Sequence, residues 1–128
     1  MRLSNLSFSI NLHDRQIPIT INKWDSKTKK LVNVNVKKLD DAWSKDASNY
    51  IGPNGKGGIR DRYKQFGEFS KTAPSIEASD VHVNENGFIM FGNGRHRFAY
   101  MRDHGIAVAP VAMSNESIQN AIKYNLLA

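Results

Sequence analysis

The chain of 128 residues contains no cysteine. Disulfide bonds, thiolate zinc sites and cysteine nucleophiles are therefore excluded. Long apolar runs are also absent, since no stretch approaches the roughly 18 residues that a membrane-spanning helix needs. The first residues lack the charged-then-apolar pattern of a signal peptide. Together these absences predict a soluble, cytoplasmic protein with no membrane partner.

Acidic residues are scarce relative to basic ones. The chain has 12 Asp and Glu against 18 Lys and Arg, which gives a net charge of +6. Such an excess favours anionic partners, whether nucleotide, nucleic acid or acidic protein. A basic surface that is only solvated is the alternative. Because the length suits one domain and no linker-like segment interrupts the chain, we predict a single domain over residues 1–128.

Patterns of apolar residues predict the secondary structure. Two-residue alternation and short β-rich runs indicate strands at 6–12, 17–21, 31–36, 81–83, 88–91 and 107–113, the first three of which form a small meander. Helical spacing indicates helices at 39–47, 59–69, 98–104 and 115–127. Asn86-Gly87 is a strong hairpin signal between two of the strands.

The sequence Gly92-Asn93-Gly94-Arg95-His96-Arg97 is the segment that points to chemistry. It lies between a predicted strand and a predicted helix, and free N–H groups at a helix start attract anions. Glycines let a phosphate approach the backbone, and Arg95 and Arg97 can clamp its oxygens in a bidentate manner. Surface ion pairs are the alternative role for the two arginines.

This segment and its surroundings resemble the ParB/sulfiredoxin superfamily. The match runs through Gly87-Phe88-Ile89-Met90-Phe91, the six residues above and Phe98-Ala99-Tyr100, then Gly105 and Ala109-Pro110-Val111. Residues 80–113 carry the motif. The features fall in the family's order of strand, glycine-rich turn, helix, glycine and strand, which is more specific than a glycine-arginine motif alone.

The resemblance implies a ParB/sulfiredoxin-like α+β fold with a small mixed sheet and three or four helices. It also implies that ATP or CTP binds with its phosphates on the turn. Carried over by position, the nucleotide-binding residues are Gly92, Asn93, Gly94, Arg95, His96 and Arg97. In sulfiredoxins a reactive cysteine precedes the His-Arg pair; here that position is Arg95, so sulfinic-acid reduction by a thiol is excluded.

Two functions follow from this resemblance, and fold alone does not choose between them. The first is Mg²⁺-dependent nucleotide hydrolysis or DNA cleavage, with Arg97 stabilising phosphoryl charge and His96 assisting proton transfer as the catalytic residues. The second is a non-catalytic plasmid- or phage-type protein that binds nucleic acid or inhibits a partner protein. A small-molecule kinase is a third possibility. Whether the chain is an enzyme stays open, and for His96 the structural alternative is a buried ring bonded to backbone.

Other charged residues are candidates for supporting roles. Asp80 and Glu85 are the nearest upstream acids and can hold Mg²⁺ against a triphosphate, although plain surface solvation is the alternative. The glycine-rich loop at 52–58 lacks the Walker A pattern. With the helix that follows, it still supplies cations that can touch a nucleic-acid backbone, unless it is only a connector. These predicted nucleic-acid contacts are Lys56, Arg60, Arg62 and Lys64.

Overall fold

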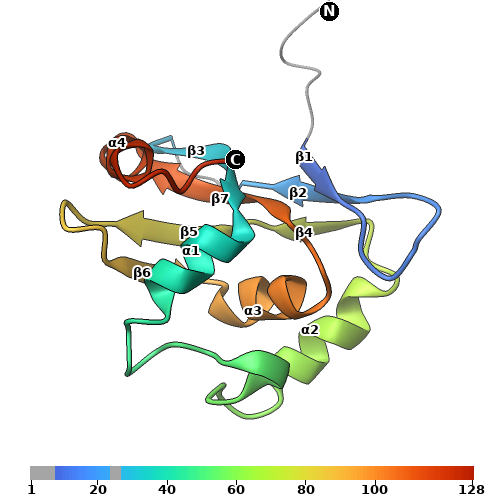
Figure 1. Cartoon of the computed structure of the whole chain (residues 1–128). Helices are drawn as coiled ribbons and strands as arrows, with labels where there is room; N and C mark the ends of the chain where they lie inside the picture. The colour runs from blue at the N-terminus through green and yellow to red at the C-terminus, as the bar shows by residue number, and fades with distance from the viewer. Residues whose placement is uncertain (1–7, 24–26) are drawn as a thin grey trace, which may run out of the picture.

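A computed structural model of the protein describes residues 8–23 and 27–128. In this part of the chain, four α-helices and seven strands build an α+β fold (Figure 1). The strands are β1 (Phe8–Ile10), β2 (Ile19–Asn22), β3 (Lys29–Asn35), β4 (Ser75–Glu77), β5 (Ser79–Val83), β6 (Ile89–Asn93) and β7 (Val108–Ser114). The helices are α1 (Val36–Trp43), α2 (Arg62–Ser70), α3 (Arg95–Asp103) and α4 (Asn115–Lys123), and a short 3-10 turn, η2, spans Pro53–Gly55.

The strands divide between two mixed sheets. The four-stranded sheet has the order β3-β7-β5-β6, in which β5 runs parallel to β7 and the other pairs are antiparallel. The three-stranded sheet has the order β1-β2-β4, with β1 antiparallel and β4 parallel to β2. The prediction of a meander from the first three strands is therefore wrong, because β3 pairs with β7. Alternation shows which face of a strand is buried, but not which strand is its neighbour.

Helix α3 lies between the two hydrophobic cores and contributes to both. Phe98 and Ala99 belong to the core that joins the four-stranded sheet to α1 and α4. Tyr100 and Met101 belong to the core that joins the three-stranded sheet to α2. All four side chains are buried, and each large one stabilises the fold by about 1.5–3 kcal/mol. The start of α3, which follows β6 directly, is thus held rigidly from both sides.

Local backbone signals explain where helix ends differ from the sequence-based ranges. Helix α1 begins at Val36 instead of 39, because the Asn35 side chain accepts a hydrogen bond from the Lys38 amide at 3.0 Å and caps the helix there. Helix α2 begins at Arg62 instead of 59, since Arg60 has a left-handed φ of 51°. Helix α4 ends at Lys123 instead of 127. The short strand β4 was not predicted, because three residues after a proline leave too little alternation to detect.

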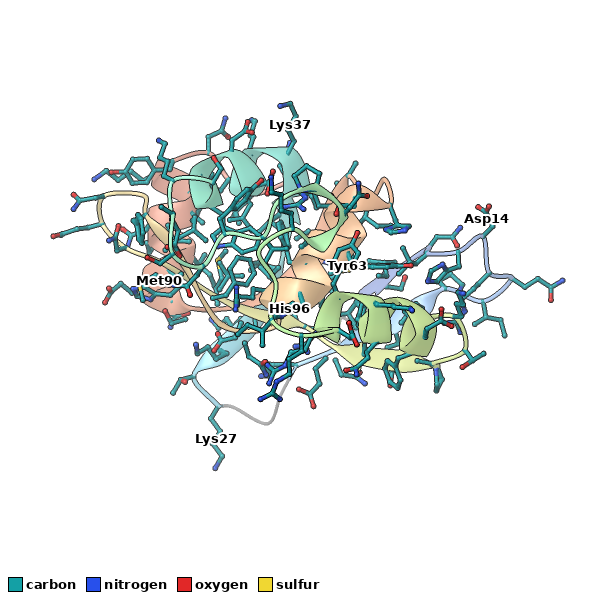
Figure 2. The ribbon with its side chains drawn as sticks, turned by 90° about the horizontal axis from the view of Figure 1, so that it is seen from below. Asp14, Lys27, Lys37, Tyr63, Met90 and His96 are labelled. Carbon is teal, nitrogen blue, oxygen red and sulfur yellow. The ribbon has the colours of Figure 1, made fainter. Side chains whose placement is uncertain are left out.

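Helices α2 and α3 pack closely through a glycine. A Cβ at Gly67 would lie 2.6 Å from the Tyr100 ring, so this contact requires glycine. The Tyr100 ring in turn stacks on His104 with a centroid distance of 3.8 Å. The close approach brings Tyr63, in the first turn of α2, to Asp103 at the end of α3. Figure 2 shows Tyr63 and His96 near the middle of this face, where the two helices meet.

Candidate functional site

The start of α3 offers an open set of backbone donors. Gly94 precedes the helix with a left-handed φ of 82°, and no side chain caps the helix start. The first turn also contains no acidic residue. Unpaired N–H groups at such a terminus carry partial positive charge, which favours a bound anion. The structure thus has an uncapped helix start at the predicted turn, and anion binding there stays a prediction.

The two glycines of the motif make room for protein side chains. A Cβ at Gly92 would lie 2.7 Å from Oδ2 of Asp80, and one at Gly94 would lie 2.6 Å from Nη2 of Arg97 and 2.8 Å from Oγ of Ser79. The sequence suggested that these glycines admit a phosphate. In the structure, the space beside them accommodates a carboxylate and a guanidinium, so an anion has to approach the N–H groups of the helix itself.

Arg95 and Arg97 leave the helix in different directions. Nη1 of Arg95 donates to the backbone oxygen of Asn49 at 2.9 Å, whereas Nη2 of Arg97 reaches the backbone oxygen of Ala78 at 3.4 Å. Residues two apart in an α-helix are separated by about 200° around its axis, which accounts for the divergence. The clamp of both guanidinium groups on one phosphate, expected from the sequence, is not the arrangement that the side chains adopt here.

His96 is buried and bonded to backbone. The Ile59 amide donates to Nε2 of His96 at 2.9 Å, and the residue is 8% exposed. Burial lowers the pKa of the imidazole, and the charges of Arg95 and Arg62 lower this pKa further. His96 is therefore a neutral ring at neutral pH whose Nε2 is already engaged. This contact ties the loop before α2 to the start of α3, and it brings Arg62 into the neighbourhood of Arg95.

Arg102 anchors the same loop from the far end of α3. Its guanidinium pairs with Oδ1 of Asp40 and with Oδ1 of Asp103, both at 2.9 Å, and donates to the backbone oxygens of Ile51 at 2.6 Å and Gly52 at 2.8 Å. The Arg102 side chain is only 11% exposed. Sequence reasoning missed this residue, because no local motif distinguishes an arginine that bonds to a loop fifty residues away.

Asp103 completes the anchor. Its Oδ2 accepts hydrogen bonds from the Asn54 amide at 2.9 Å and from the Tyr63 hydroxyl at 2.8 Å. The hydrogen bonds from Arg102 and Tyr63 outweigh burial and lower the pKa of the Asp103 carboxyl. Burial and this hydrogen bond both raise the pKa of the Tyr63 hydroxyl, which therefore stays protonated. Both the loop and the first turn of α2 are thereby fastened to α3.

The predicted nucleic-acid residues are all exposed, and they lie on this anchored loop and on α2. Lys56, Arg60, Arg62 and Lys64 form no ion pair with any residue in 8–23 or 27–128. Of the four, Arg62 is the one whose charge acts on His96 at the start of α3. With Arg95 they form a set of cations that we call the basic surface. The basic surface consists of Lys56, Arg60, Arg62, Lys64 and Arg95.

The two predicted metal ligands do not come together. Nζ of Lys29 pairs with Oδ1 of Asp80 at 2.7 Å. Glu85 lies in the turn beyond the other end of β5, whose last residue, Val83, is about 10 Å from Asp80 along the strand at the usual rise per residue. Among the described residues, no three His, Asp or Glu side chains are grouped so that they can hold a metal ion. Asp80 and Glu85 therefore lie toward opposite ends of β5, and Asp80 alone lies next to Gly92 and the start of α3.

Comparison with known proteins bears on the fold. No protein-family model matches the chain, and no curated protein is significantly similar to it. A solved structure does match: the Oncogenic Suppression Activity Protein, a plasmid fertility inhibition factor, in its gold(I) cyanide derivative. The TM-score is 0.67 at 16% identity, over 92% of this chain and 68% of the other. The chain shares the fold of this plasmid factor.

This likeness confirms the α+β class with four helices and mixed sheets. At 16% identity it establishes the fold alone. Membership of the ParB/sulfiredoxin superfamily stays a prediction from the motif, as do the roles of Gly92 to Arg97. Among the helices that the structure describes, none has the length and apolar character needed to cross a membrane.

Proposed function

We propose that the chain binds nucleic acid through its phosphate groups, at the start of α3 and the adjoining basic surface. One observation carries this proposal. The start of α3 has neither a side-chain cap nor an acidic residue in its first turn, and the hydrogen bond from the Ile59 amide to His96 holds the loop before α2 against it. The charges of Arg62 and Arg95 both act on His96 at this place. Helix N–H groups and nearby guanidinium groups are complementary to phosphate oxygens.

Two further features support a nucleic acid, a polymeric anion, as the ligand. The basic surface draws its exposed cations from three places, the loop, α2 and the start of α3, so it offers contacts to more than one phosphate. The net charge of +6 favours the approach of a polyanion to any part of the molecule. The matched structure is described as a plasmid fertility inhibition factor, which agrees with a plasmid-type protein that acts on nucleic acid or on a partner protein.

Arginine-to-glutamine changes in the basic surface test this proposal. We expect Arg62→Gln and Arg95→Gln each to weaken binding of a fluorescein-labelled 20-mer DNA by about fivefold to tenfold at 0.1 M salt, because each removes a phosphate contact. The slope of log K against log salt concentration should fall by about 0.9 per lost contact. Fluorescence anisotropy titrations at four salt concentrations measure both quantities.

Lys123→Gln is the matched control. It removes one exposed positive charge from α4, which lies at the opposite corner of the molecule from α2 (Figure 1). We expect its affinity and salt slope to stay close to those of the unaltered protein. Equal weakening by Lys123→Gln and Arg62→Gln would show that net charge alone attracts the DNA, and the proposed site would then be rejected.

A nucleotide with Mg²⁺ is the second candidate, and the position of Asp80 favours it. The Asp80 carboxylate lies beside Gly92, next to the helix start where phosphates would bind. Mg²⁺ bound to a triphosphate needs only one or two carboxylates, so Asp80 fits this role if it exchanges its partner Lys29 for the ion. In this alternative, bound ATP or CTP supplies the phosphoryl group for hydrolysis or accompanies DNA cleavage, and Arg97 can stabilise its charge.

Calorimetric titration separates this candidate from the first. If it is correct, ATP or CTP binds at least tenfold more tightly with Mg²⁺ than without it, and Asp80→Asn abolishes the difference. Asp41→Asn, on the exposed face of α1, is the control and should retain it. Phosphate release that Arg97→Ala removes would add turnover to binding. Absence of binding heat for both nucleotides, with and without Mg²⁺, would eliminate the nucleotide candidate and leave the nucleic-acid proposal intact.

A further inference from the structure

A pocket lies on the other side of the first turn of α3 from Arg95. It is open to solvent, has a volume of about 550 Å³ and is lined by the end of β2, by β4, by α2 and by Arg97. This volume lies within the range of sites that hold small ligands of nucleotide size. Its polar side chains include Lys23, Glu77 and Arg97, and its apolar wall is formed by Phe66 and Phe69 of α2. The charged groups and the aromatic wall thus come from different elements.

Arg97 lacks partners for a charged group in such a place. Its Nε is buried without an acceptor among the described residues, and the contact from its Nη2 to Ala78 is long at 3.4 Å. Glu77 acts on it electrostatically but forms no ion pair with it in the described part of the chain. A guanidinium has five donors, and leaving buried donors unpaired is costly. An anion in the pocket can pair with the Nη donors of Arg97 that line it, although Nε itself is shielded.

The aromatic wall is exposed where it meets this charge. Phe69 is 57% exposed, which is high for a phenylalanine, whereas Phe66 behind it is 8% exposed and belongs to the core. A flat apolar group that covers Phe69 would remove this surface from water. Lys23 provides a second cation at the pocket, and the Glu77 carboxylate can accept hydrogen bonds from amino groups of the same ligand.

The pocket and the basic surface share helix α2. Arg62, Phe66 and Phe69 occupy positions i, i+4 and i+7, so they lie along one stripe of this helix. At the start of α3, Arg95 and Arg97 diverge toward the loop and toward the pocket. A chain of phosphates that begins at Arg62 and Arg95 therefore reaches the pocket by crossing the first turn of α3.

We propose that this pocket binds one unpaired nucleotide of a single-stranded nucleic acid, with its phosphate on Arg97 and Lys23 and its base stacked on Phe69. The inference rests on the proposed nucleic-acid function and adds a preference for single strands. A paired base cannot leave its duplex without an unstacking cost, whereas an unpaired base is free to stack on an aromatic ring. Stacking tolerates any base, so the preference concerns strandedness instead of sequence.

Phe69→Ala tests the pocket separately from the basic surface. We expect the unaltered protein to bind a labelled 12-mer single strand more tightly than a duplex of the same sequence. Phe69→Ala should weaken single-strand binding about tenfold and leave duplex binding and the salt slope unchanged, since it removes stacking and no charge. Phe69→Tyr should restore the preference. Because Phe69 is largely exposed, these variants keep the core intact.

Ile122→Ala is the matched control, because Ile122 is an apolar residue of α4 with a similar exposure of 55%. It should leave both affinities unchanged. Equal affinity for the two DNA forms, or a Phe69→Ala variant that keeps the single-strand preference, would overturn the pocket assignment while the basic-surface proposal stands. Failure of the unaltered protein to bind either form at low salt would overturn both.

Discussion

Replacement of Arg102 with alanine should lower the free energy of unfolding by about 3–5 kcal/mol. The change removes ion pairs to Asp40 and Asp103 and two hydrogen bonds to the backbone oxygens of Ile51 and Gly52. Asp40 and Asp103 are only 18% and 12% exposed, so the variant leaves two poorly hydrated carboxylates without their main partner. Urea unfolding followed by circular dichroism measures the loss.

An exposed ion pair provides the control for Arg102. Lys37 and Asp41 form an i, i+4 pair on α1 whose side chains are 85% and 68% exposed. Solvent screens this pair, so Lys37→Ala should change the free energy of unfolding by less than about 0.5 kcal/mol. Similar losses in the two variants would contradict the role of Arg102 as the anchor of the loop. Faster hydrogen exchange at the Asn54 amide, which bonds to Asp103, would localise the effect.

Trp43→Ala is the second change with a large expected effect, a loss of about 3–5 kcal/mol. Trp43 is fully buried at the end of α1. Its ring centroid lies 4.8 Å from that of Tyr50, 4.6 Å from Phe91 and 6.0 Å from Phe98. The alanine variant would leave a cavity where α1, β6, α3 and the loop after α1 meet. The midpoint of thermal unfolding and the urea midpoint should both fall.

Trp43→Phe distinguishes lost packing from lost hydrogen bonding. The Trp43 Nε1 donor is buried without a partner among the described residues, so replacing indole with phenyl removes an unsatisfied polar group along with some volume. We expect the phenylalanine variant to retain most of the stability that the alanine variant loses. If both variants lower the free energy of unfolding by the same amount, the interpretation of Trp43 as an apolar packing residue is wrong.

The hairpin before the site was predictable because its signals are local. Asn86-Gly87 indicated a turn, and the Asn84 side chain accepts hydrogen bonds from the Asn86 and Phe88 amides at 2.9 Å while Gly87 adopts a φ of 80°. These interactions join residues within four positions of each other, so the sequence contains the whole turn. A helix after the glycine-arginine motif was predicted for the same reason, at 98–104, whereas α3 begins three residues earlier at Arg95.

Side-chain directions within the motif were harder to predict, although periodicity already limits them. One phosphate clamp by Arg95 and Arg97 requires both side chains on one side of the helix, but their spacing separates them by about 200°. Arg97 instead lines the pocket beside α2, where an unpredicted strand, β4, supplies the opposite wall. The motif predicted a glycine turn before a helix, which the structure has, and assigned to one ligand two arginines that contact different segments.

By itself, the sequence determined the class of fold elements, the basic character and the glycine-to-helix turn at Gly94, because charge and short-range backbone preferences are properties of neighbouring residues. Tertiary structure alone decided the pairing of β3 with β7, the anchoring of the loop by Arg102 and the hydrogen bond from the Ile59 amide to His96. These contacts join segments that are far apart in the chain. They form because α3 is packed between two cores, and no pattern of neighbouring residues predicts that packing.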